Sequence, residues 1–228
     1  MNGRTIIALV FGIIGVAVLV WLGAWQVERL AWKNSILAQI KERIADAPVP
    51  LPENPEPERD KYLPVQIDGT FGDEALRVLV SRKLVGAGYR LISPFETGGR
   101  RVLVDRGFVG VNDPVPAPRG GNVTVTGNLH WPDDRGSATP ENDTGGNIWY
   151  ARDIDAMARQ LGTDPVLVIV RKLSQPEQGV TPLPVDTAAI PNDHLQYAIT
   201  WFALAVVWAV MTGYFILRAQ AARKGAGR

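Results

Sequence analysis

Two histidines and no cysteines occur among the 228 residues, which narrows the choice of groups that could bind a metal or attack a substrate. His194 stands one position before Leu195–Leu217, a run of twenty-three residues without a charge. A neutral imidazole binds iron and other transition metals through one ring nitrogen. His194 is therefore the strongest candidate for chemistry in this chain.

On a helix, the residues around His194 would form one stripe of alternating large and small side chains. Positions seven apart lie on one face of a helix, and the stripe consists of His194, Ala198, Trp201, Ala205 and Trp208. A planar apolar cofactor could lie against this stripe while His194 holds its metal.

The same residues also have an ordinary explanation, and the residues alone leave both open. Aromatic residues gather at membrane–water interfaces, and four of them would form such a belt: Trp21, Trp25, Tyr197 and Trp201. His194 could merely cap a helix. Trp208 could pack on Ala8 or Gly12 of a neighbouring helix, because small residues permit close approach.

Two further polar residues are expected to be structural. His130, beside Trp131, is expected at the surface or in a turn. Arg106, in Asp105-Arg106-Gly107, is expected to form an ion pair or hydrogen bonds at a strand end, with docking of a partner as the alternative.

Motifs of common enzyme classes are missing from the sequence. There is no nucleophile elbow G-x-S-x-G and no phosphate-binding G-x-x-x-x-G-K-[ST]. Gly107 and Gly110 lack the rest of a dinucleotide fingerprint, and without cysteine both disulfides and thiolate metal sites are excluded. We expect a protein that is not an enzyme.

Two segments are long and apolar enough to cross a membrane. Ile6–Trp25 and Leu195–Leu217 contain no charge and no proline. Roughly twenty apolar residues of helix span the hydrocarbon core of a bilayer. The sequence therefore predicts two transmembrane helices and the lipid bilayer as a partner.

The distribution of charge predicts the orientation of these helices. All 23 acidic residues lie between Glu28 and Asp193, and that stretch has a net charge of −4 because it holds 19 of the 24 basic residues. The ends are purely basic, through Arg4 and a cluster after the second span: Arg218, Arg223, Lys224 and Arg228. Positive residues favour the cytoplasmic side, so both termini are expected there. A basic stripe for nucleic acid is absent, and no nucleic-acid partner is expected.

The first span has one alternative explanation. Residues 1–24 could be a signal peptide cleaved near Ala24. Its apolar stretch is longer than the core of a usual signal, and no A-x-A site follows it. We therefore expect an uncleaved helix, which continues out of the membrane as an amphipathic helix to about residue 46 and ends before the proline-rich connector 48–60.

The middle of the chain predicts a small β-rich domain. Alternating or continuous apolar runs indicate strands at Tyr62–Phe71, Ala75–Val85, Tyr89–Phe95, Arg101–Val109, Asn122–Trp131 and Pro165–Val170. Turns are expected at Gly86-Ala87-Gly88 and Gly98-Gly99, and short connections favour antiparallel pairing. The last run is expected to be a buried central strand.

One short helix is predicted at Asp153–Leu161, with Asp153 as its N-cap and Gly162 as its stop. Asn147 and Trp149 are expected to lead into it. The predicted fold is thus an α+β membrane protein, in which two terminal transmembrane helices flank an antiparallel β-rich domain with one or two helices. Its expected parts are helix 5–26, domain 47–193, helix 194–217 and basic tail 218–228.

Four stretches in order along the chain carry a family resemblance. They are Leu22–Arg29 followed by Lys33, Val102–Val109, a block from Pro140 through Trp149 to Ala158, and His194–Phe202. The first resembles the Leu-Gly-x-Trp-Gln-x-x-Arg signature of the surfeit locus protein family, and the last holds an intact His-Leu-Gln-Tyr-x-x-Thr-Trp block. Phe108 departs slightly, since tryptophan is also common there.

This resemblance implies a role in assembly of cytochrome c oxidase. The family assists maturation of the haem a-containing subunit I on the outer face of a bacterial inner membrane or the mitochondrial inner membrane, and haem a synthase is a second expected partner. It implies haem a as a transiently bound cofactor, with His194 as the ligand of its iron. We expect Trp201 and Tyr197 beside the ring, and Arg29 or Arg106 at the propionates.

A scaffold is the competing function. In that case the β-rich domain and the helices would hold the oxidase subunit during maturation while another protein delivers the haem. The isolated protein would then contain no cofactor.

Overall fold

The computed structural model describes residues 3–83, 85–118, 120–188 and 190–226. The chain divides into two compact units, one of Met1–Gln39 with Ala188–Arg228 and one of Ile40–Thr187. Of the basic residues that predict orientation, Arg228 and the side chains of Arg4, Arg223 and Lys224 lie outside the described residues.

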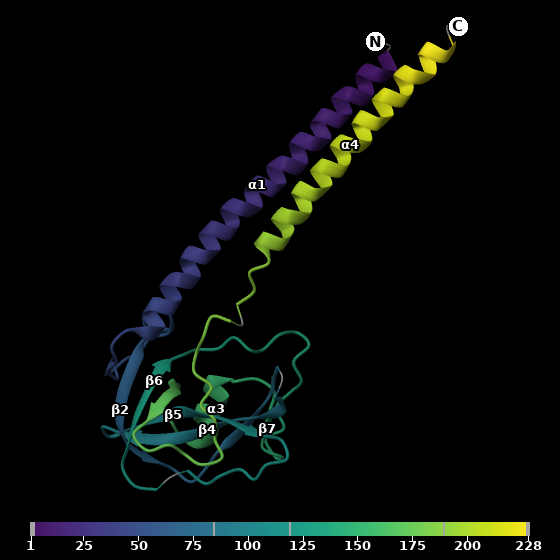
Figure 1. Ribbon diagram of the computed structural model, residues 1–228. Coiled ribbons are helices and arrows are strands. Elements are labelled where there is room, and N and C mark those ends of the chain that lie inside the picture. Colours follow the sequence, from purple (N-terminus) through teal and green to yellow (C-terminus); the bar gives the residue numbers. More distant parts are fainter. Residues whose placement is uncertain (1–2, 84, 119, 189, 227–228) are drawn as a thin grey trace. The chain divides into compact units, whose positions relative to one another are not determined.

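The first unit is a pair of long helices that run side by side in opposite directions (Figure 1). Helix α1 spans Gly3–Ala45 and helix α4 spans His194–Ala226. Helix α1 therefore continues past its apolar run to residue 45, as predicted, while α4 also extends through most of the predicted tail. Contacts between Gly12 and Thr212 and between Gly23 and Phe202 set the antiparallel register.

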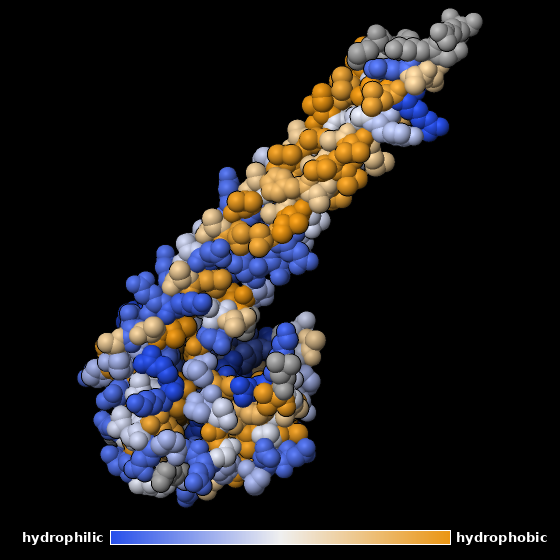
Figure 2. Space-filling model, in the orientation of Figure 1, coloured by the Kyte–Doolittle hydropathy of each residue, from blue (hydrophilic) through white to orange (hydrophobic). Residues whose placement is uncertain are grey.

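Both helices are long and apolar enough to cross a membrane by length and composition. Only 11% and 6% of their most apolar stretches are buried within the protein, unlike the core helix of a soluble domain. Figure 2 shows apolar side chains over most of the visible surface where the two helices pair. Such a surface is stable in lipid and costly in water. The protein is an α+β membrane protein.

The second unit is built on one mixed β-sheet. Among its described residues the strands are β1 (Val49–Pro50), β2 (Pro64–Phe71), β3 (Leu76–Arg82), β4 (Gly86–Thr97), β5 (Arg100–Gly110), β6 (Val123–Leu129), β7 (Ile148–Trp149) and β8 (Leu167–Leu173). The helices are α2 (Pro57–Asp60) and α3 (Ile154–Leu161).

The strand order is β1-β2-β6-β8-β5-β4-β3-β7, and β2 also pairs with β4. This extra pairing joins Thr70 to Glu96 and Phe71 to Phe95, so β2, β6, β8, β5 and β4 form a closed ring. Gly69 lies at the closure, where a Cβ would collide with the carbonyl oxygen of Glu96. Closure pairs β2 with β4 directly, and the short strands β1 and β7 stand at the two ends of the strand order.

Two apolar clusters fill the barrel and cover one side of it. The interior cluster combines side chains of β2, β5, β6 and β8 with Phe95. The second cluster packs Met157 and Leu161 of α3 on Leu103, Leu167 and other outward-facing residues of the sheet. Residues Leu167–Val170 are nearly inaccessible in the centre of the sheet, as the continuous apolar run predicted.

Several local predictions are confirmed and others are corrected. Asp153 caps α3 by accepting a hydrogen bond from the backbone N–H of Ala156 at 3.0 Å, and Gly162 ends the helix in the left-handed conformation. Neighbouring hairpins are antiparallel, but β8 is parallel to β5, because the chain crosses over through α3. The turn before β4 lies ahead of Gly86 rather than at residues 86–88, which belong to the strand.

Candidate functional site

His194 is the first residue of α4, and it lies opposite Gln26 of α1. The distance from Nδ1 of His194 to Oε1 of Gln26 is 2.7 Å, a hydrogen bond. Both side chains are half-buried. Within the described part of the chain, no hydrogen bond reaches the other ring nitrogen, Nε2.

A second polar pair lies next to this contact. Asn192 donates from Nδ2 to Oδ1 of Asn34 at 2.8 Å. The remaining amide oxygen of Asn192 is buried and has no hydrogen-bond partner among the described residues. Buried polar atoms usually have a hydrogen-bond partner. A ligand, a lipid headgroup or a water molecule could therefore donate a hydrogen bond to this oxygen.

The predicted stripe on α4 faces α1. Ala198 and Ala205 are 2% and 5% exposed, and Trp201 is half-buried. Trp208 packs over Gly15, and its ring centroid is 5.5 Å from that of Phe11. The packing explanation for Trp208 is therefore confirmed, with Gly15 in the place expected for Ala8 or Gly12.

Two other predicted site residues remain accessible. Tyr197, one turn from His194, is 54% exposed. Arg29, one turn from Gln26, is exposed, and its guanidinium carbon lies 4.3 Å from the centroid of the Trp32 ring. No carboxylate pairs with Arg29 among the described residues. Residues three apart are neighbours on a helix surface, so the exposed Arg29 is adjacent to Gln26 on α1.

Arg106 has a different environment from that expected for a propionate ligand. It is fully buried in β5, and its Nε donates to Glu177 at 3.0 Å in a two-pronged ion pair. Its other donors reach Ser93 and the carbonyl of Pro116. The structural ion pair that the sequence suggested is confirmed. Every side of the guanidinium is occupied, which leaves no exposed donor for a cofactor carboxylate.

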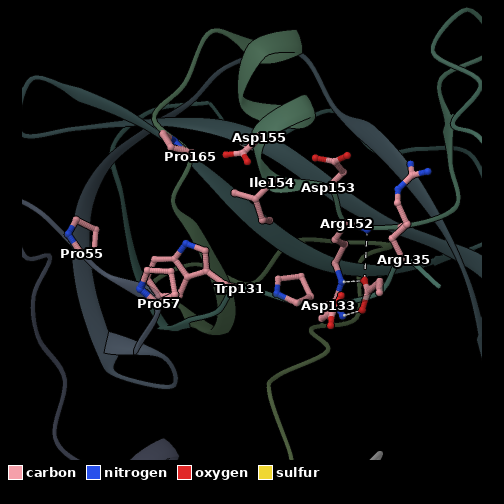
Figure 3. A pocket seen from close by; sticks show the side chains of 13 residues that line it. Pro55, Pro57, Trp131, Asp133, Arg135, Arg152, Asp153, Ile154, Asp155 and Pro165 are labelled. Carbon is pink, nitrogen blue, oxygen red and sulfur yellow. Dashed lines mark hydrogen bonds and ion pairs between the residues drawn. The ribbon is translucent and has the colours of Figure 1, made fainter. Parts of the chain in front are cut away.

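The β unit contains a cleft of about 520 Å³ beside α3 (Figure 3). Prolines and Trp131 form one side, and charged residues form the other. Arg152 binds Asp134 through two hydrogen bonds of 2.6 and 2.9 Å, drawn dashed in Figure 3. Burial raises the pKa of the Asp134 carboxyl, but the bonds from Arg152 outweigh it, so that the net pKa is lowered.

His130 is less exposed than predicted. Its ring stacks on Tyr62 with centroids 5.4 Å apart, and its Nδ1 is buried with no hydrogen-bond partner among the residues that the structure describes. Burial, followed by the positive charge of Arg152, lowers the pKa of His130 to about 4. His130 lies just after β6, in the expected strand-to-loop position, but its ring is half-buried rather than at the open surface.

Asn147 and Trp149 do more than lead into α3. Asn147 has a positive φ of 52°, and its side chain bonds the backbone of Ala75 and Arg77. Trp149 is 2% exposed and belongs to β7, which runs parallel to β3. This two-residue strand was not predicted, because its pattern is too short to distinguish from a loop.

Comparison with known proteins places the chain in a family. Residues 13–206 match the model of the SURF1 family, a segment that contains the whole β unit and part of each long helix. The chain belongs to the SURF1 family. It is 32% identical to Surfeit locus protein 1 of Rattus norvegicus and 31% identical to that of Homo sapiens, over 80–81% of this chain and 67–69% of those proteins. It is also 30% identical to a SURF1-like protein of Monosiga brevicollis, over 91% of this chain and 84% of the relative.

The SURF1 family match includes Gln26 and His194, which the fold brings together across 168 positions. Sequence reasoning identified His194 but gave Gln26 no role. A signal was present, because Gln26 is the first polar side chain after the uncharged run Ile6–Trp25. Assigning its partner required the register of the two helices.

Proposed function

We propose that this protein assists assembly of cytochrome c oxidase by carrying haem a to oxidase subunit I. The carrier site lies at the end of the helix pair where α4 begins. The observation that carries this proposal is the environment of His194: an imidazole held through Nδ1 at the start of an apolar helix, with Nε2 free of hydrogen bonds in the described residues.

The donor set fits a haem that must later be released. One imidazole supplies a nitrogen ligand of the kind that haem iron accepts, and no group of three or more acidic or histidine side chains in the described residues could hold a bare metal ion instead. A single protein ligand binds cargo reversibly, whereas two strong axial ligands would oppose its transfer.

The surroundings of His194 suit the two chemically different parts of haem a. Trp201 and Tyr197 offer aromatic surface to the apolar ring, and the lipid would cover the rest. Arg29 has no carboxylate partner in the described structure and could bind a propionate by a charge-assisted hydrogen bond. The propionates would then point toward water at the membrane surface.

The proposed orientation places both termini in the cytoplasm and the β unit in the periplasm of a bacterial inner membrane, or in the intermembrane space of a mitochondrion. The basic residues at the two chain ends support this orientation. Haem a would come from haem a synthase and pass to subunit I within the same membrane.

The decisive experiment is an optical spectrum of detergent-purified protein from cells that make haem a, recorded beside His194→Ala. Haem a in the wild type and its loss in the folded variant would establish the carrier and its ligand. Haem in both would keep the carrier but move the ligand elsewhere. Absence of haem from folded wild-type protein would contradict the proposal.

The scaffold is a second candidate, favoured by the cleft in the β unit. Its lining includes Trp131, and aromatic side chains are enriched at protein–protein interfaces, while the exposed Asp133 and Asp155 could lie at the polar rim of such a contact. It predicts that haem-free protein co-purifies with subunit I and that substitutions in this cleft, but not at His194, abolish the association.

A further inference from the structure

We propose that Gln26 is the positioning residue of the site: it accepts a hydrogen bond from Nδ1–H of His194 and so presents Nε2 as the metal ligand. The metal-binding part of this inference rests on the proposed function. The tautomer itself does not, because it is a property of the haem-free protein.

We infer the direction of the bond from the atom of Gln26 that faces the ring. The amide oxygen Oε1 carries no hydrogen, so the atom 2.7 Å away must bring the proton. A neutral imidazole has one proton, and with that proton on Nδ1 the lone pair lies on Nε2. Free histidine favours the opposite tautomer, with the proton on Nε2, which could not bind a metal through that atom.

Metal-binding histidines commonly use this arrangement. The ring nitrogen that does not bind the metal donates to an oxygen, which fixes the tautomer and the orientation of the ring. In this chain the oxygen belongs to the other helix. Hence Nε2 of His194 is held ready to bind the metal only when α1 and α4 are paired in the observed register.

Packing one turn away holds that register. Gly23 lies on the same face of α1 as Gln26, and the ring of Phe202 occupies the space beside it. On the other side of Gln26, Asn34 holds Asn192, which lies two residues before His194. The contact is thus bracketed by two others that oppose sliding of one helix along the other.

An amide rather than a carboxylate is consistent with a carrier. A carboxylate would accept a stronger, charge-assisted bond and make the imidazole a more strongly donating ligand. Glutamine gives the same direction of hydrogen bond with a weaker effect on the ring. The site would then orient its ligand without binding the cargo too tightly to release it.

The first test measures the tautomer in the absence of haem. Imidazole ¹⁵N chemical shifts of His194 are recorded on the full-length protein at a pH where histidine is neutral, and His130→Gln removes the only other histidine signal. We expect the Nδ1–H tautomer with Gln26 and a shift toward Nε2–H in Gln26→Leu. A dominant Nε2–H tautomer in the protein with Gln26 would overturn the inference.

The second test measures haem a binding by titration and optical spectrum. Gln26→Leu is expected to weaken binding about 10- to 100-fold, while Gln26→Glu keeps an acceptor, so it should retain the tautomer and bind haem a at least as tightly as the wild type. Gln39→Leu, at an exposed position of the same helix, is the matched control and should change neither.

The outcomes separate the two proposals. If the wild type binds no haem, the proposed function fails, and the ¹⁵N measurement still decides the role of Gln26. If wild type binds haem through His194 but Gln26→Leu binds it equally well, the positioning role is wrong. If Gln26→Leu does not fold, Gln26→Glu is compared with Gln26→Asn instead. The shorter side chain of asparagine places its acceptor oxygen one carbon farther from Nδ1 of His194. Equal haem a affinity in these two variants would contradict the inference.

Discussion

The ring of Phe202 in α4 lies over Gly23 in α1, and its nearest carbon is 2.7 Å from the point that a Cβ at residue 23 would occupy. Close packing of this kind is how helices associate in lipid, where apolar surfaces gain little from leaving water. The glycine of the family signature therefore has a structural reason: it allows the two helices to approach one turn from the contact between Gln26 and His194.

Substitution of Gly23 should have a graded effect on helix pairing. Gly23→Ala requires only a rotation of the partly exposed Phe202 ring, whereas Gly23→Leu should force the helices apart. The cysteine-free chain allows a direct measurement, disulfide formation between Gly12→Cys and Thr212→Cys, whose Cβ atoms would be 3.1 Å apart. We expect a several-fold loss of cross-linking with Gly23→Leu.

The control for this experiment is Gly213→Leu, because nothing in the described structure lies within 4 Å of a Cβ at that position. It should leave cross-linking unchanged. Equal cross-linking in Gly23→Leu and Gly213→Leu would show that the contact with Phe202 does not set the register.

The buried ion pair between Arg106 and Glu177 should dominate the stability of its region of the barrel. Both side chains are nearly inaccessible, at 0% and 7% exposed. Removing one charge leaves the other buried without a partner, which costs about 3–5 kcal/mol. Glu177→Gln should therefore increase hydrogen exchange across β5 by a factor of hundreds, measured by mass spectrometry.

The double variant Arg106→Met/Glu177→Leu distinguishes this explanation from a simple loss of packing. It removes both charges together, so it should recover a large part of the protection lost in Glu177→Gln. If the double variant is less protected than the single one, the contacts of Arg106 with Ser93 and Pro116 matter more than its charge.

The elements that the sequence predicted are those with strong local signals. Asp153 and Gly162 mark the ends of α3 by their own chemistry, and the apolar run at Pro165–Val170 needs no partner to be recognised as buried. Closure of the barrel was not predictable, because it depends on contact between Phe71 and Phe95 across the sheet. The role of Gln26 could not be predicted for the same reason, because it depends on a hydrogen bond to His194 on the other helix.

His130 should make the stability of the β unit depend on pH. Its pKa is about 4 in the folded protein and about 6.5 when unfolded, so the unfolded chain binds more protons between these values. Stability should be complete above about pH 6.5 and fall as the pH decreases toward 4. The resulting loss of unfolding free energy is at most about 3 kcal/mol. Solvent screening of this partly exposed ring reduces the loss to about 1–2 kcal/mol.

The measurement is hydrogen exchange of peptides from β6 between pH 7 and 4, corrected for the intrinsic exchange rate. His130→Phe keeps an aromatic ring against Tyr62 and removes the titrating group. The variant should therefore lose most of the dependence on pH in this window. A dependence that persists unchanged in His130→Phe would assign it to other groups.

The orientation in the membrane can be tested because the chain has no native cysteine. Single cysteines at exposed Ser137 in the β unit and at exposed Ala222 near the end of α4 are treated with a membrane-impermeant maleimide in intact cells whose outer membrane is permeable to the reagent. With the β unit on the outer side and both termini inside, Ser137→Cys reacts and Ala222→Cys reacts only after lysis.

A third variant tests the first helix, because Gly3→Cys should behave like Ala222→Cys. Labelling of Gly3→Cys in intact cells would reverse the assignment of the first helix, whereas loss of residue 3 from the mature protein would identify a cleaved signal peptide. The unsubstituted chain gives the background for each reaction, because it has no thiol to label.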